Sequence, residues 1–130
     1  MASHVQSDSR IASVMHAPVV SIRAGASLRE AALALHGADV GTLAVMDGDV
    51  VAGVISERDV VGALADGADP DRGWVSDVMS PDPRYLTLGD QVGSAVEIML
   101  AAGIRHLPVV DEGQLVGIVS IRDLAGALVA

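Results

Sequence analysis

The chain repeats one pattern twice, and this duplication limits the folds open to it more than any other feature. Residues 53–60 read Gly-Val-Ile-Ser-Glu-Arg-Asp-Val and residues 117–124 read Gly-Ile-Val-Ser-Ile-Arg-Asp-Leu. The two segments are offset by 64 residues, the difference between positions 117 and 53. The same offset relates further positions without a gap, among them Met15 and Met79, Ala31 and Ala95, and Leu43 and Leu107. We therefore expect two copies of one supersecondary unit, packed with pseudo-two-fold symmetry around two equivalent clefts.

Each copy predicts the element order β-α-β-β-α, which makes an α/β protein of the mixed α+β type. In the first copy, β-branched and apolar runs predict strands at 19–22, 42–46 and 50–55. Capping residues and apolar spacing predict helices at 28–36, ending near Gly37, and at 57–66. In the second copy the corresponding strands are 84–87, 106–110 and 114–119, and the helices are 90–102 and 120–129.

The predicted domain organisation follows from these elements. Residues 1–10 are small and polar and are expected to form a flexible leader. The first repeat spans 11–66 and the second spans 74–130, with a turn-rich linker at 67–73 between them. Trp74, where the linker meets the second repeat, is predicted to be a packing anchor.

Composition excludes several classes of protein. The formal charge is −9, and all eight basic residues are arginine, so a binder of duplex nucleic acid, which needs a basic face, is not expected. No apolar run reaches the roughly 18 to 20 residues of a membrane span. The absence of cysteine removes disulfides and thiolate metal sites. A cytoplasmic protein without a resident metal or required cofactor is the expectation.

Apolar residues on the predicted helix 90–102 indicate a partner. Val92, Ala95 and Met99 form one apolar stripe at helical spacing, whereas Ile98 and Leu100 lie off that stripe and would be exposed in a monomer. Exposed apolar surface of this kind usually marks an interaction site. We therefore predict a homodimer in which helices 90–102 and 27–36 supply much of the contact.

A serine and an aspartate recur where a buried strand meets a helix. Ser56 and Asp59 occupy this place in the first copy, and Ser120 and Asp123 occupy it in the second. A helix N-terminus favours a phosphate, and a carboxylate one turn later suits a vicinal diol such as that of ribose. Ser-x-x-Asp is also close to a capping box, which needs no ligand, so a purely structural role stays open.

The full pattern of Gly-hydrophobic-x-Ser-x-x-Asp after a hairpin, found twice, resembles the CBS domain, named for cystathionine β-synthase. Residues 78–81 (Val-Met-Ser-Pro) and 105–111 (Arg-His-Leu-Pro-Val-Val-Asp) are similar to motifs of that family. The resemblance covers residues 11–129 and implies a CBS pair, or Bateman module. It implies binding of an adenosine-containing ligand: AMP, ADP or ATP, with S-adenosylmethionine or a dinucleotide as further options. It also implies that the Ser–Asp pairs are ligand-binding residues.

The two copies differ beside these pairs. Where the second copy has Arg105 and His106, the first has Gly41 and Thr42, so we expect unequal sites with more phosphates held near the cationic pair. The resemblance places Ser21 and Ile22 in one copy beside adenine. Tyr85 takes that place in the other copy, where it would either stack on the base or fill space.

No motif of an enzyme active site is present, so catalysis is not expected. The leading hypothesis is a stand-alone regulatory module that senses an adenine nucleotide in the clefts between the repeats and signals to an effector protein through a change of shape or of dimer assembly. The alternative is a structural or interaction dimer with vestigial clefts. A thermal-shift screen over adenine nucleotides would separate the two.

Overall fold

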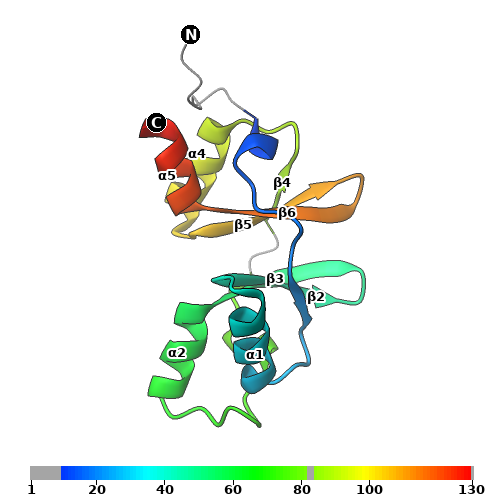
Figure 1. Ribbon diagram of the computed structural model, residues 1–130, viewed down its shortest axis with the longest axis vertical. Helices are drawn as coiled ribbons and strands as arrows, with labels where there is room; N and C mark the ends of the chain where they lie inside the picture. The colour runs from blue at the N-terminus through cyan, green and yellow to red at the C-terminus, as the bar shows by residue number, and fades with distance from the viewer. Residues whose placement is uncertain (1–9, 82–83, 130) are drawn as a thin grey trace. The chain divides into compact units, whose positions relative to one another are not determined.

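The computed structural model describes residues 10–81 and 84–129, which form two compact units (Figure 1). The central unit lies within Val20–Pro83, and the terminal unit combines the described parts of Met1–Val19 and Arg84–Ala130. The predicted leader lies outside the described residues except for Arg10, whose backbone forms a β-bridge with Gln91. No helix of the described residues is long and apolar enough to cross a membrane.

The central unit is a three-stranded sheet with helices on one face (Figure 1). Its strands stand in the order β1-β2-β3, with β1 parallel to β2 and β2 antiparallel to β3. In chain order the elements are β1 (Ser21–Arg23), α1 (Leu28–Ala38), β2 (Thr42–Asp47), β3 (Val50–Ser56), α2 (Glu57–Ala65) and the short α3 (Val75–Val78).

The terminal unit repeats this arrangement with the order β4-β5-β6. Its elements are a 3-10 helix (Ile11–Ser13), β4 (Leu86–Thr87), α4 (Val92–Ala102), β5 (His106–Asp111), β6 (Gln114–Ser120) and α5 (Ile121–Val129). The strand register is also the same: Val45 pairs with Gly53 as Val109 pairs with Gly117, and both hairpins shift register at the next residue. The predicted α/β fold of two tandem β-α-β-β-α repeats is thus confirmed.

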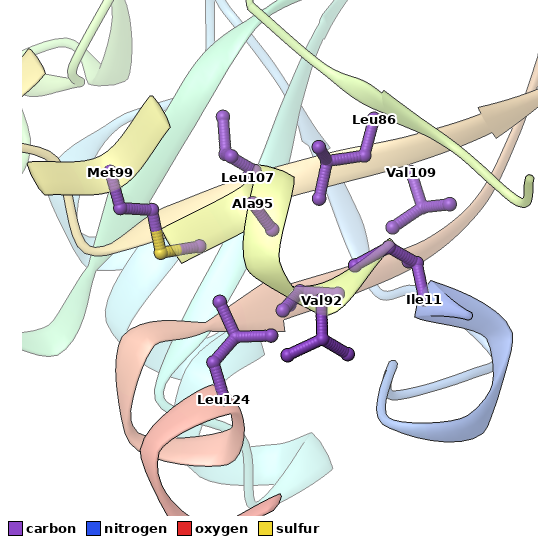
Figure 2. Close-up of a cluster of buried hydrophobic side chains, with 9 residues drawn as sticks. Ile11, Leu86, Val92, Ala95, Met99, Leu107, Val109 and Leu124 are labelled. Carbon is purple, nitrogen blue, oxygen red and sulfur yellow. The ribbon is translucent and has the colours of Figure 1, made fainter. Parts of the chain in front are cut away.

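Each unit has its own hydrophobic core, and the two cores are built from equivalent positions. In the terminal unit, Figure 2 shows Ile11 beside Val92 and Val109, with Leu124 contributed by α5. Ile11 corresponds to Val75 of the central unit at the repeat offset, and both side chains are fully buried. With no Phe in the chain, aliphatic residues and Met99 fill these interiors.

The segments that precede the repeats are exchanged between the units. The first lead-in segment (residues 10–19) belongs to the terminal unit, although it is followed in the chain by the strands of the central unit. The second lead-in segment (residues 74–81) belongs to the central unit in the same way. Each is tied by two backbone hydrogen bonds to the last strand of its sheet, His16 to Ile118 at 2.8 and 3.1 Å and Ser80 to Val54 at 2.9 and 3.1 Å.

The predicted linker caps the start of α1 instead of lying free. The carbonyl of Gly73 accepts from the N–H of Leu28, and that of Pro70 accepts from the N–H of Arg29, so two unpaired amides of the first helical turn are satisfied. The guanidinium of Arg29 donates two hydrogen bonds to the carboxylate of Asp71. These hydrogen bonds lower the pKa of Asp71 and raise that of Arg29.

Three local predictions differ from the structure, and one short helix was missed. Helix α1 continues to Ala38, two residues beyond the predicted range 28–36, because Asp39 adopts the left-handed conformation that ends it (φ 53°). Ile98 is partly buried and packs against the core, since it lies three residues after Ala95 and flanks the buried stripe. Trp74 is 45 % exposed, and the buried anchor is its neighbour Val75. Helix α3, with four residues, was not predicted.

Candidate ligand-binding junctions

The junction of β3 and α2 brings Ser56 and Asp59 together as predicted. Ser56 is the last residue of β3 and the N-cap of α2. Its backbone N–H donates to Oδ2 of Asp59 at 2.8 Å, and the N–H of Asp59 donates to Oγ of Ser56 at 3.2 Å. This is a capping box, so both side chains already have the partners that the structural alternative requires.

The junction of β6 and α5 has the same geometry with one bond more. The N–H of Asp123 donates to Oγ of Ser120 at 3.1 Å, and the N–H of Ser120 donates to Oδ2 of Asp123 at 3.3 Å. The hydroxyl of Ser120 also donates to Oδ2 of Asp123 at 2.7 Å. The Asp123 side chain remains 24 % exposed, so a ligand can reach the carboxylate.

At each junction, residues at the start of the neighbouring strand lie beside the Ser–Asp pair. His106 stands opposite Ser120 in the register of β5 and β6, and the carbonyl of Arg105 accepts from the N–H of Ile121 at 2.8 Å. Thr42 and Gly41 hold the equivalent places in the central unit, beside Ser56 and Glu57. The structure therefore brings the predicted cationic pair to the Ser120–Asp123 junction, with Arg105 exposed and His106 half buried.

Fewer backbone amides are free to bind an anion than the sequence suggested. At the start of α2, the N–H of Glu57 is taken by the carbonyl of Gly41, and that of Asp59 by Oγ of Ser56. At the start of α5, Ile121 and Asp123 are engaged in the same way. A phosphate at either junction would therefore depend mainly on side-chain cations.

The residues predicted beside adenine are placed less uniformly. Ser21 and Ile22 pair with β2 in the same unit as Ser56; Ser21 is exposed, whereas the side chain of Ile22 is partly buried against the core. Tyr85 directly precedes β4 in the terminal unit, and its side chain is 55 % exposed. That exposure shows that Tyr85 does not fill space in the core and leaves its ring accessible.

The structure adds one residue that sequence reasoning did not select. Nε2 of His16 lies 3.0 Å from Oδ2 of Asp123, although the two residues stand near opposite ends of the chain. The imidazole belongs to the first lead-in segment and is 70 % exposed. The available signal was the repeat offset, which aligns His16 with Ser80, the serine of the Met-Ser-Pro motif at 79–81.

Two other features of the described residues bear on function. No group of three or more histidine, aspartate or glutamate side chains within 10–81 and 84–129 is arranged to hold a metal ion. A cavity of about 290 Å³ lies between α1 and α2 in the central unit, and none of the predicted site residues line it. Its walls are Ala32, Leu35, His36, Asp39, Val40, Glu57, Val60 and Val61.

Comparison with known proteins identifies the family and several relatives of this chain. The sequence profile of the CBS domain matches residues 11–66 and 75–130. An uncharacterized 17.7 kDa protein of Acidianus ambivalens is 38 % identical over 121 residues, which are 92 % of this chain and 73 % of that protein.

Two solved structures are similar over most of their length. The CBS-domain containing protein ATU1752 from Agrobacterium tumefaciens is 37 % identical, with a TM-score of 0.73 over 85 % of this chain and 84 % of that one. The CBS domain pair of protein MJ0100, solved in complex with 5′-methylthioadenosine and S-adenosyl-L-methionine, has a TM-score of 0.79 over 91 % of this chain and 94 % of that one. At 22 % identity, the second similarity concerns the fold alone.

Proposed function

Because this chain belongs to the CBS domain family, whose profile it matches twice, we propose that it is a regulatory module that binds an adenosine-containing ligand. AMP, ADP and ATP are the leading ligands, with S-adenosylmethionine or a dinucleotide as alternatives. The observation that carries the proposal is the Ser–Asp pair, repeated at the same strand–helix junction of both units with the carboxylate partly exposed. A carboxylate in that position accepts hydrogen bonds from a ribose diol.

Binding would be converted into a signal by a change in module shape or dimer assembly, passed to an effector protein in the cytoplasm. A ligand shifts such an equilibrium only by its differential affinity for the two states. No catalytic step is assigned to the protein. The solved CBS pair of protein MJ0100 supports the ligand class, because a pair of this fold holds adenosine compounds there.

The two junctions are proposed to be unequal in phosphate preference. Arg105 and His106 flank the Ser120–Asp123 junction, whereas Gly41 and Thr42 flank the other. Hydrogen bonds to phosphate from charged donors are stronger than those from neutral donors. A ligand with more phosphates should therefore bind at the terminal unit, and replacing Arg105 by Gly with His106 by Thr should remove its preference for ATP over AMP.

Replacing Asp123 by asparagine should weaken adenine-nucleotide binding at one site by about 1 to 3 kcal/mol, the usual scale for a hydrogen bond to a charged group. Asparagine keeps an acceptor for the N–H of Ser120 and so preserves the cap. Calorimetric titration with AMP and with ATP measures the effect, and Asp59→Asn tests the other site. Asp111→Asn, at an exposed position of the same unit, is the matched control. The proposal fails when the folded wild type binds no adenosine compound.

The alternative function, an interaction dimer with vestigial sites, is favoured by one observation. Ser56 and Asp59 satisfy each other without a ligand, as a merely structural cap does. Both functions include a homodimer, for which Leu33 on α1 and Leu100 on α4 are the candidate contacts, since Leu100 is 72 % exposed. A titration without nucleotide binding, together with a stable dimer, would favour the alternative.

Sedimentation at high micromolar concentration should give a species of twice the 13.2 kDa chain mass. Leu33→Glu combined with Leu100→Glu should shift this species to the monomer, because each substitution places a charge in an apolar contact. Val50→Glu, at an exposed apolar position on β3, is the control and should leave the dimer intact. A wild-type monomer at that concentration contradicts the proposed assembly.

A further inference from the structure

His16 is held over the Ser120–Asp123 junction by its backbone. Its N–H donates to the carbonyl of Ile118 at 2.8 Å, and its carbonyl accepts from the N–H of Ile118 at 3.1 Å. Ile118 lies two residues before Ser120 on β6, so the lead-in segment crosses the strand just ahead of the junction. An added Cβ at Gly117 would lie 2.5 Å from Sδ of Met15, which shows how closely the segment lies against the strand.

The imidazole of His16 and the polar groups of Ser120 approach the same oxygen of Asp123. Nε2 of His16 lies 3.0 Å from Oδ2 of Asp123, and that oxygen accepts hydrogen bonds from the hydroxyl of Ser120 at 2.7 Å and from the N–H of Ser120 at 3.3 Å. A carboxylate oxygen has two lone pairs, so Ser120 already supplies two donors and the imidazole nitrogen takes up space beside them. A hydroxyl group of a ligand that reaches Oδ2 must therefore take the place of one of them, and the largely exposed His16 side chain is the one that moves with least disruption.

The central unit provides a comparison within the same chain. Ser80 occupies the position equivalent to His16, with the same pair of backbone bonds to Val54. Among the residues that the structure describes, the side chain of Asp59 bonds only to Ser56, and it makes no hydrogen bond or ion pair with the second lead-in segment. The two junctions therefore differ in one side chain that bears directly on the ligand-binding carboxylate.

We propose that His16 is a specificity-determining residue, which competes with ligand hydroxyls for the carboxylate of Asp123. A neutral sugar diol then binds more weakly at the Ser120–Asp123 junction than at the Ser56–Asp59 junction. A displaced imidazole remains within reach as a donor to an anionic group, so the penalty falls mainly on uncharged nucleosides. This inference rests on the proposed function, since it concerns the same site.

The test measures adenosine affinity at one junction at a time. In the Asp59→Asn background, which leaves the terminal junction as the intact site, His16→Ser should tighten adenosine binding about two- to fivefold, the range of an exposed ion pair. Serine is the residue that the other lead-in segment carries at this position, so the backbone bonds are expected to persist. Binding of 2′,3′-dideoxyadenosine, which lacks the diol, should not change.

The reciprocal variant and a surface control complete the design. Ser80→His in the Asp123→Asn background should weaken adenosine binding at the central junction, whereas His36→Ser, an exposed histidine on α1, should change neither site. The inference would be overturned if His16→Ser left the adenosine affinity unchanged while binding at this junction still depended on Asp123. The proposed function would then stand. Failure of the wild type to bind any adenosine compound overturns both.

A ligand-free measurement tests the contact itself. The ¹⁵N resonance of His16 Nε2 should shift on Asp123→Asn, because the charged carboxylate 3.0 Å from it is replaced by a neutral amide. An unchanged resonance would show that the imidazole does not engage Asp123 in solution, and the inference would then be wrong whatever the nucleosides do.

Discussion

Replacing Ile11 by alanine should lower the free energy of unfolding of the terminal unit by about 2–5 kcal/mol, the cost of truncating a fully buried aliphatic side chain. Ile11 is completely buried although it lies on a 3-10 helix of only three residues. The side chain inserts between α4 and β5, where Val92 and Val109 line its site (Figure 2). Urea denaturation followed by circular dichroism measures the change.

The neighbouring residue provides the control for this substitution. Ala12 lies on the same 3-10 helix but is exposed, and Ala12→Ser should change the stability by no more than about 0.5 kcal/mol. Val75→Ala should have an effect of the same kind in the central unit, because Val75 is the equivalent buried residue. Equal stability of Ile11→Ala and the wild type would contradict the assignment of the first lead-in segment to the terminal unit.

Replacing Gly53 by alanine should destabilise the central unit by about 2–5 kcal/mol, from two effects that act together. A Cβ at this position would overlap the carbonyl oxygen of Ser80, which is backbone and cannot rotate away. The strain of overpacking is typically about 1–3 kcal/mol, and displacing Ser80 also weakens its two hydrogen bonds to Val54, each worth about 0.5–1.5 kcal/mol. Thermal and urea unfolding of the purified variant measure the loss.

Two other glycines calibrate that result. At Gly117, the equivalent position, the nearest obstacle is the flexible thioether of Met15, so Gly117→Ala should cost less than Gly53→Ala. At Gly62, inside α2, an added Cβ meets nothing within 4 Å, and alanine should stabilise the helix by about 0.5–1 kcal/mol. The explanation by overlap fails if Gly53→Ala lowers the free energy of unfolding no more than Gly117→Ala does.

The duplication made most of the fold predictable from the sequence. Once residues 53–60 are aligned with 117–124, each strand or helix assigned in one copy supports its counterpart in the other. The structure keeps this equivalence down to the register shift after Val45 and after Val109. The Ser–Asp junctions were predictable for the same reason, since the residues that bond are only three positions apart.

The remaining features depend on contacts that no local pattern encodes. The end of α1 was misplaced because Asp39 adopts the left-handed conformation, which aspartate tolerates more readily than most residues but which glycine usually supplies. The exchange of the lead-in segments and the contact between His16 and Asp123 join residues far apart in sequence. The side chains at such contacts are ordinary in isolation, and only the tertiary fold gives them a partner.

The exchanged lead-in segments also set the order in which the chain can acquire its structure on the ribosome. Residues 20–83 are contiguous, so the central unit can close its core while later residues are still being translated. Ile11, by contrast, can complete its packing only after Leu124 has been translated. At about 5–20 residues per second, this apolar side chain remains unburied for roughly 5 to 20 seconds. During that time the first lead-in segment exposes an apolar side chain on the nascent chain, which is the kind of surface that chaperones bind.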